Sequence, residues 1–248
     1  MLIVCALFLV GLVAGCVDAI AGGGGLLTLP ALMLTGIGDN SALALGTNKG
    51  QGVFGTAVAL RKYSLSPLLD RRRALQSFAP ALLGGAIGTL IVAEISPRVL
   101  NPLLMALLAT AAALVLFQRP PSRQLQPRHR SAWLAAAVGF SLAFYDGFFG
   151  PGTGTFLILA YTCLWHDPLD AASANAKVVN FASNLASTAA FAFRRLIFWN
   201  YVLPMAAGQI IGGYVGAHLT IRSGRGLVRY AVVAVTIAMI VRLGWRFV

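Results

Sequence analysis

The amino-acid sequence predicts an all-α polytopic membrane protein made of two related halves, on three observations: scarce charge, long apolar segments and an internal repeat. Only 10% of the 248 residues are charged and 58% are hydrophobic, whereas about a quarter of the residues of a soluble domain are charged. Several uncharged stretches, such as residues 74–93 and 196–221, reach the roughly 20 residues that a helix needs to cross hydrocarbon. We therefore expect a lipid bilayer around the chain and several crossings of the inner (cytoplasmic) membrane.

The basic residues favour a membrane protein over a nucleic-acid-binding one. The chain has 19 Lys and Arg against 7 Asp and Glu, and the basic residues gather in short segments between the apolar stretches, which is typical of membrane topology. Binding of nucleic acid needs a solvated basic face, so no nucleic acid is expected as a partner. The three cysteines, Cys5, Cys16 and Cys163, lack metal-ligand spacing, and their odd number argues against a disulfide framework. No metal site and no cofactor are expected.

The two halves are related by a constant offset of 128 positions. Asp18 matches Asp146, and Lys49 matches Lys177; chance would not align such rare charged residues in one register without a gap. Six glycines of the first half match glycines of the second in the same way: Gly11, Gly22, Gly24, Gly84, Gly85 and Gly88. The predicted divisions are residues 1–117 for the first repeat, 118–130 for a solvated linker rich in Pro and Arg, and 131–248 for the second repeat.

Each repeat is expected to contain the same elements in the same order. An apolar helix runs into an Asp and a glycine-rich break, because each Gly costs a helix about 1 kcal/mol relative to Ala. A shorter apolar segment follows, then a helix that carries the Lys, and then two uncharged helices. These elements are residues 2–17, 26–36, 41–60, 74–93 and 99–117 in the first repeat, and 132–145, 156–164, 171–193, 201–221 and 227–243 in the second. The spacing of Gly84, Gly85 and Gly88 places small residues on one helix face, which allows close helix contact in lipid.

The orientation of the repeats depends on the path of the chain at each break. If the two segments around a break form a re-entrant hairpin, each repeat crosses three times and the repeats are inverted. If each repeat crosses four times, the repeats are parallel, and the distribution of basic residues between the loops fits both arrangements. We favour inversion, because broken helices that face each other at the midplane recur in secondary transporters.

Four charged residues lie inside apolar segments or at their breaks: Asp18, Lys49, Asp146 and Lys177. In each repeat the Lys follows the Asp by 31 positions. An ionised side chain at the centre of a bilayer costs about 3 kcal/mol on insertion scales, so these groups are expected to face a cavity or to pair with one another. Two structural Asp–Lys pairs that merely join the repeats are one reading. A functional site is favoured, because glycine breaks and amides converge on the same places.

The glycine breaks predict a site for an anion. The helix that restarts after each break points unpaired N–H groups and the positive end of its dipole at the break, and helix starts of this kind bind anions. Backbone groups freed at membrane depth also have to be satisfied by protein, ligand or water. The candidate substrate-binding residues here are Gly22, Gly23, Gly24 and Gly25 in the first repeat and Gly150, Gly152, Thr153 and Gly154 in the second.

Amide side chains accompany both lysines. The candidate substrate-binding residues of this kind are Asn48 and Gln51 beside Lys49, and Asn175, Asn180 and Asn184 beside Lys177. Spacings of three and four place Lys177, Asn180 and Asn184 on one helix face. A ladder of amide donors next to a Lys suits an oxyanion, and interhelical hydrogen bonding is the alternative explanation.

The two breaks and the lysine helices also carry recognisable motifs. Residues 15–25 read Gly-x-x-Asp-Ala-Ile-Ala-Gly-Gly-Gly-Gly, and Thr47-Asn48-Lys49 follows. Residues 145–154 read Tyr-Asp-Gly-Phe-Phe-Gly-Pro-Gly-Thr-Gly, followed by Ala174-Asn175-Ala176-Lys177 and Asn180-Phe181-Ala182-Ser183-Asn184. Across nearly the whole chain this pattern resembles the TauE/SafE family of bacterial membrane proteins, the sulfite exporters, although Gly50 and Ala176 depart from it beside the lysines. The resemblance implies a secondary carrier in the bacterial inner membrane for small organic or inorganic sulfur-containing anions such as sulfite or sulfoacetate.

Together these features predict alternating access around a midplane site formed by the two breaks. Lys49 and Lys177 would attract the anion, and Asp18 and Asp146 would balance the lysines or carry a coupling ion, H⁺ or Na⁺. An anion channel and a non-transporting scaffold or accessory protein are the alternatives. A membrane enzyme is not expected, because the embedded polar residues include no His/Glu cluster. The sequence leaves open which anion is moved, the direction of transport, the coupling ion and the oligomeric state.

Overall fold

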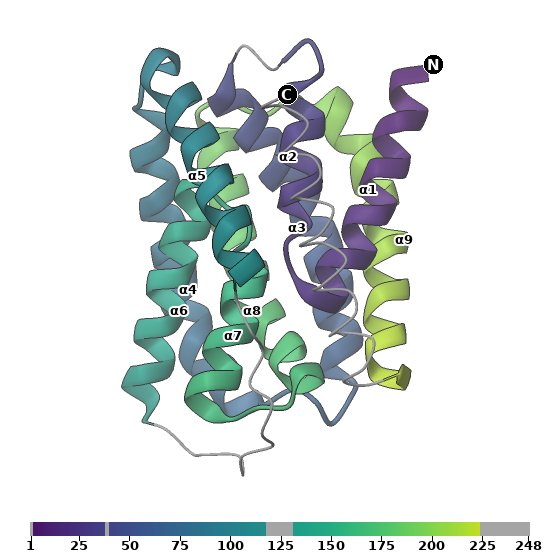
Figure 1. The fold of residues 1–248 in the computed structure, drawn as a ribbon, viewed down its shortest axis with the longest axis vertical. Coiled ribbons are helices and arrows are strands. Elements are labelled where there is room, and N and C mark those ends of the chain that lie inside the picture. The colour runs from purple at the N-terminus through teal and green to yellow at the C-terminus, as the bar shows by residue number, and fades with distance from the viewer. Residues whose placement is uncertain (1, 38–39, 118–130, 224–248) are drawn as a thin grey trace.

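The computed structural model describes residues 2–37, 40–117 and 131–223, and this part of the chain is all-helical, with nine helices and no strand (Figure 1). The prediction of an all-α fold is therefore confirmed there. The linker 118–130 and the helix predicted at 227–243 lie outside the described residues.

Each of the remaining predicted apolar segments forms a helix in the structure, and its ends differ from the predicted ends by a few residues. The helices of the first half are α1 (Leu2–Ala21), α2 (Gly25–Met33), α3 (Ser41–Ser64), α4 (Arg71–Ala93) and α5 (Pro97–Phe117). Those of the second half are α6 (Ala132–Phe148), α7 (Thr153–Trp165), α8 (Leu169–Phe193) and α9 (Trp199–Ser223). The starts of α7, α8 and α9 lie 128 positions after the starts of α2, α3 and α4, the offset at which the sequence repeats.

The glycine breaks, rather than the aspartates, end the first helix of each half. α1 continues to Ala21 and α6 to Phe148, so Asp18 and Asp146 lie in the last turn of their helices and not just after them as predicted. Gly22 and Gly23 then have φ of 71° and 84°, and Gly150 and Gly152 have φ of 95° and 86°. Only glycine adopts this left-handed backbone at little cost. Through these breaks α2 turns back against α1, and α7 turns back against α6 (Figure 1).

Glycines bring α1 and α9 into backbone contact along their length. A Cβ built on Gly212 would lie 2.1 Å from the carbonyl oxygen of Leu12, and one on Gly216 would lie 2.4 Å from that of Cys16. No larger residue fits at either position, as expected for small residues at a close helix contact. Because the residue numbers rise together, α1 and α9 run parallel.

The same contact recurs between α4 and α6. Cβ atoms built on Gly84 and Gly88 would lie 2.3 Å and 2.2 Å from the carbonyl oxygens of Phe140 and Phe144. These four residues are offset by 128 from the α9 and α1 contact residues. The first helix of each half therefore packs against the fourth helix of the other half.

The first helices of the two halves, α1 and α6, point in opposite directions. α3 lies parallel to α9, since Gly46 meets Leu196 and Gly55 meets Gly213, while the short connection from α3 to α4 reverses the chain. α1, α3 and α9 consequently point one way, and α4 and α6 point the other. In Figure 1, α1 descends from the N-terminus at the top, whereas α6 begins at the bottom and ascends.

Apolar side chains cover the outside of this bundle, and polar ones lie within it. Leu83 on α4 and Leu203 on α9 are 62% and 67% exposed, whereas Lys49 and Lys177 are buried. A soluble protein has the opposite distribution of charge. By length and composition alone, two helices of the described part, Leu2–Ala21 and Arg71–Ala93, are apolar enough to cross a membrane.

Candidate functional site

A polar cavity of about 40 Å³, room for roughly three water molecules, lies between the two halves at the glycine breaks. Residues of α1, α3, α6, α8 and α9 line it together with residues of both breaks. The predicted site residues among them are Asp18, Gly23, Gly24, Gly25, Asn48, Lys49, Gln51, Asp146, Gly150, Gly154, Asn180 and Asn184. The fold thus gathers into one place residues that are as far apart in the sequence as 18 and 184.

Each embedded lysine pairs with the aspartate of the other half. Lys49 Nζ lies 2.8 Å from Asp146 Oδ2, and Lys177 Nζ donates a hydrogen bond of 2.8 Å to Asp18 Oδ2. The Lys49–Asp146 contact joins two buried side chains, which are 3% and 7% exposed. Removing one partner of such a buried pair costs about 3–5 kcal/mol. The two pairs therefore hold the halves together, and the net charge of the four embedded residues is zero.

Asp18 occupies the start of α2, where the sequence predicts an anion. Its Oδ1 accepts a hydrogen bond of 3.2 Å from Gly24 N–H, while Oδ2 binds Lys177. A carboxylate at a helix start is stabilised by the exposed N–H groups and the helix dipole. The protein thus supplies its own anion at this position. The Asp18 side chain is 20% exposed, in contrast to the fully buried Lys177, so it is the member of the pair that meets the cavity.

The two breaks touch each other at glycines. A Cβ built on Gly22 would lie 2.3 Å from the carbonyl carbon of Gly154, and one on Gly154 would lie 2.6 Å from Gly22 Cα. The Thr155 hydroxyl donates across the same contact to the carbonyl oxygen of Ala21 at 3.2 Å. Neither glycine position has room for a side chain. The hydroxyl of Thr153 donates to Gly150 O at 2.7 Å and so is engaged within its own break.

The amides around the cavity are only partly engaged. Asn48 Oδ1 accepts hydrogen bonds from Thr28 Oγ1 at 2.5 Å and from Gln51 Nε2 at 3.1 Å. Gln51 Oε1 is buried and has no hydrogen-bond partner in the described part of the chain. The side chains of Asn180 and Asn184 likewise make no hydrogen bond to any described residue, although both line the cavity. A buried amide oxygen without a partner, such as Gln51 Oε1, costs about 1–3 kcal/mol, and all three amides face a cavity that fits a polar ligand or water.

Five predicted site residues do not line the cavity: Gly22, Gly152, Thr153, Asn175 and Lys177. Gly22 forms the contact between the breaks, Gly152 and Thr153 shape the start of α7, and Lys177 acts on the cavity through Asp18. Asn175 alone lies in a different cluster.

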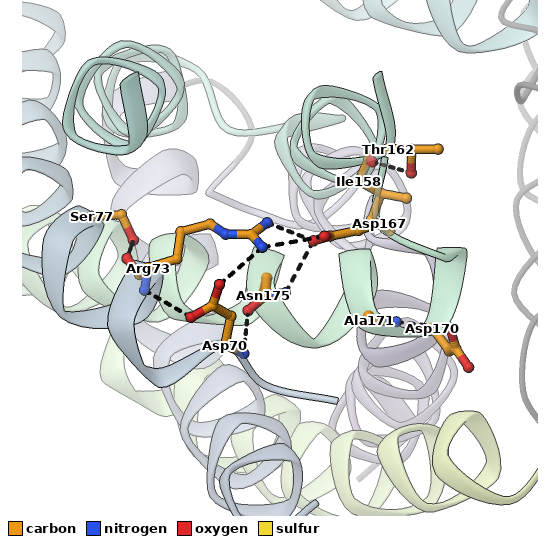
Figure 2. A network of polar contacts seen from close by, with 9 residues as sticks. All are labelled: Asp70, Arg73, Ser77, Ile158, Thr162, Asp167, Asp170, Ala171 and Asn175. Carbon is orange, nitrogen blue, oxygen red and sulfur yellow. Dashed lines mark hydrogen bonds and ion pairs between the residues drawn. The ribbon is translucent and has the colours of Figure 1, made fainter. Parts of the chain in front are cut away.

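That cluster, which we name the Arg73 network, consists of Asp70, Arg73, Asp167 and Asn175 (Figure 2). Arg73 Nη1 and Nη2 bind the two carboxylate oxygens of Asp167 at 2.5 Å and 3.2 Å, and Nη2 also binds Asp70 Oδ2 at 3.1 Å. Asn175 accepts from Asp70 N at 2.9 Å and donates to Asp167 Oδ2 at 3.2 Å. The network joins the start of α4 to the α7–α8 connection, and Asn175 serves this junction between the halves.

Three further residues line the cavity and were missed by the sequence reasoning: Gly52, Thr56 and Gln209. Gly52 and Thr56 lie 128 positions before Asn180 and Asn184, so a full comparison of the repeats could have found them. Gln209 is the single amide in the uncharged stretch 201–221, which is a weaker signal. Among the described residues, no group of three His, Cys, Asp or Glu side chains lies close enough to hold a metal ion.

Comparisons with known proteins indicate a probable membrane transporter. The chain is 38% identical over 245 residues to a probable membrane transporter protein of Haemophilus influenzae, with 96% of this chain and 95% of the relative covered. It is 33% identical to the probable membrane transporter protein YfcA of Escherichia coli K12, over 96% and 88% of the two chains. No solved structure matches it significantly. The sulfite exporter TauE/SafE family model matches residues 7–243, and the chain belongs to that family.

Proposed function

We propose that the protein is a secondary carrier that moves a small sulfur-containing oxyanion across the bacterial inner membrane by alternating access. The observation that supports this most directly is the cavity between the halves, which is lined by the amides of Gln51, Asn180 and half-buried Asn184, and where the buried Gln51 Oε1 has no hydrogen-bond partner among the described residues. Such groups suit a ligand that leaves again, since a permanent structural contact would engage them.

The arrangement of the halves supports alternating access. We propose that they are inverted repeats with re-entrant hairpins α1–α2 and α6–α7, because α1 and α6 point in opposite directions and the halves exchange equivalent helix contacts. Carriers of this design bind cargo near the midplane, where broken helices of both repeats meet. Rocking of one half against the other would then open the cavity to each side in turn.

Because both lysines are already paired with aspartates, we assign them a different role from that of the amides. Lys49 and Lys177 are neutralised by Asp146 and Asp18, so no excess positive charge holds the anion in the cavity. The amide donors would bind its oxygen atoms. An H⁺ or Na⁺ bound at Asp18 would release Lys177 and the start of α2 towards the anion, which gives a route for coupling cargo to a cation.

The basic residues suggest which end faces the cytoplasm. α3 ends, α4 begins and α9 ends at the same end of the bundle, which carries Arg61, Lys62, Arg71, Arg72 and Arg222. The opposite end carries Arg98, Arg194 and Arg195 in the described part. An excess of Lys and Arg marks the cytoplasmic side.

Counterflow in proteoliposomes tests the proposal. Radiolabelled sulfite, thiosulfate and sulfoacetate are offered to vesicles preloaded with the same unlabelled anion, with and without a pH gradient. Saturable exchange of one anion is the expected result, and acceleration by the gradient identifies H⁺ as the coupling ion. Flux that does not saturate and shows no counterflow would indicate a channel. Absence of flux for all three anions, with the protein correctly inserted, would favour a scaffold or accessory role and refute the proposal.

A further inference from the structure

Gln209 is a buried residue whose side-chain amide takes part neither in the ion pairs between the halves nor in the backbone contacts between helices. It is 4% exposed, lies on α9 and lines the central cavity. Its side chain makes no hydrogen bond with any residue of the described part of the chain. Its amide is therefore open to the cavity, where water or a polar ligand can satisfy it.

The surrounding backbone is shaped to admit the Gln209 amide. A Cβ built on Gly55 of α3 would lie 2.3 Å from Gln209 Oε1, so the amide passes where α3 has glycine. Gly15 of α1 belongs to the close α1–α9 contact, since a Cβ built there would lie 2.8 Å from the Gln209 backbone oxygen as well as 2.9 Å from Oε1. The offset-related position of Gln209 is Ala81, whose surroundings hold Ala143 and Ser183 at the positions related to the two glycines. The amide of Gln209 thus has no counterpart at the related position of the first half.

A second amide lies beside Gln209 over the same helix. A Cβ built on Gly52 would lie 3.5 Å from Asn184 Nδ2, and Gly52 and Gly55 are three residues apart, on one face of α3. Asn184 of α8 and Gln209 of α9 therefore reach the cavity next to each other. Both lie over the face of α3 that carries Gly52 and Gly55, where α3 has no side chain.

We infer that Gln209 is a specificity-determining residue that binds the transported anion directly, with Asn184 as its neighbour. The Nε2 and Nδ2 amide groups donate to oxygen atoms of a small oxyanion, in a cavity whose other charges are already paired. This inference rests on the proposed function, since it names a contact of the same cargo. It makes the two halves contribute differently, because the first half has Ala81 and Thr56 at the positions related to Gln209 and Asn184.

The test compares Gln209→Leu and Gln209→Glu with wild type in the counterflow assay, using sulfite, thiosulfate and sulfoacetate. Thr220→Val is the matched control: Thr220 is a buried polar residue of the same helix whose hydroxyl bonds Gly216 O at 3.1 Å, away from the cavity. Loss of one hydrogen bond to a charged ligand is worth about 1.5–3 kcal/mol. We expect Gln209→Leu to raise KM about tenfold or more with little change in maximal rate, and Gln209→Glu to abolish exchange by repelling the anion. Thr220→Val keeps the wild-type KM.

Each outcome distinguishes the inference from the function on which it rests. If wild type exchanges an anion and Gln209→Leu keeps its KM and its preference among the three anions, the inference is wrong while the carrier stands. If wild type exchanges no anion, the proposed function itself fails. Should Gln209→Leu not insert, Gln209→Asn, which keeps the amide but withdraws it by one methylene group, is measured in its place. An unchanged KM in that variant would likewise overturn the inference.

Discussion

Replacing Asp167 by Ala removes the main partner of Arg73 and leaves a guanidinium buried at the junction of the halves. The Arg73 side chain is 9% exposed and binds both carboxylate oxygens of Asp167, whose own side chain is 7% exposed. It also stacks near the rings of Tyr161 and Trp165, which lie 5.2 Å and 5.0 Å from its central carbon. These rings limit the room for water to replace the lost carboxylate.

The expected loss of stability is about 3 kcal/mol. Removing one partner of a buried ion pair lowers stability by about 3–5 kcal/mol. We expect the lower value of this range, because Asp70 still binds Arg73 at 3.1 Å. At about 2–4 °C per kcal/mol for a chain of this size, the midpoint of thermal unfolding falls by roughly 6–12 °C. Arg73→Met combined with Asp167→Leu should recover most of this loss, because no buried charge is left unpaired: the carboxylate of Asp70, which also loses Arg73, is 38% exposed.

The assay is thermal unfolding of the purified protein in mild detergent, followed by tryptophan fluorescence and by the fraction that stays monodisperse. Asp170→Ala is the matched control, since Asp170 lies three residues away and, within the described part of the chain, its carboxylate accepts only from Ala171 N, at 3.0 Å. It should shift the midpoint by less than about 3 °C, the effect of a charge at a helix start. An Asp167→Ala midpoint within that range would refute the reasoning, as would a double variant less stable than Asp167→Ala.

Three further predictions concern the ion pairs, the breaks and pH. Lys177→Ala should abolish counterflow with normal insertion. Exchanging the charges (Asp18→Lys with Lys177→Asp) should recover only part of the thermal stability, because a lysine cannot accept from Gly24 N–H at the start of α2, and should not recover transport; recovery of transport would make the pair purely structural. Gly154→Ala forces a Cβ to within 2.6 Å of Gly22 Cα and should lower stability by at least about 1–3 kcal/mol, measured against Gly36→Ala, where a Cβ meets nothing within 4 Å. Burial acts to raise the pKa of Asp70, but hydrogen bonds from the backbone and guanidinium of Arg73 outweigh it and hold this pKa below its ordinary value. The Asp70 contribution to stability is therefore complete at neutral pH and lost as the pH falls through that lowered pKa, and Asp70→Asn should flatten the acid limb of a stability–pH curve.

Local features of the sequence were sufficient to predict the helices and the breaks. Apolar length, helix caps and glycine clusters act over a few residues, and α3, for example, begins at the predicted Ser41 after the Asn40 cap, whose side chain accepts from Leu43 N. The ends at Asp18 and Asp146 were predicted one turn early, because a charged residue in a helix does not end it, whereas a glycine with positive φ does.

Contacts between the halves could not be predicted from spacing alone. The lysines and aspartates were expected to pair or to face a cavity, but which Lys meets which Asp depends on how the halves pack. Asn175 shows the limit most clearly. It lies two residues before Lys177, about 200° around the helix, and residues at that spacing do not share a face. Its amide accordingly points to the Arg73 network while Asn180 reaches the cavity.

Each end of the bundle has an equivalent hydrogen bond from a backbone N–H group to a side-chain oxygen, but the residues around that bond differ in chemistry between the two ends. Asp70 N donates to Asn175 at one end, and Phe198 N donates to Thr47 Oγ1 at 3.0 Å at the other; both donors and both acceptors are related by the offset of 128. Around this shared hydrogen bond, the basic end holds the ion pairs of Arg73. The other end has Tyr201 at the position related to Arg73, and its ring packs edge-on against Phe198 at 4.7 Å.

This difference bears on alternating access. If the two ends open in turn, opening the basic end separates buried charges, which is costly unless water or a new partner replaces them. Opening the other end exposes aromatic and aliphatic surface at about 25 cal/mol per Å². The two steps therefore respond differently to perturbation: removal of the Arg73 charge acts on one end, while truncation of Tyr201 acts on the other. A carrier assembled from two similar halves need not spend equal time open to the two sides of the membrane.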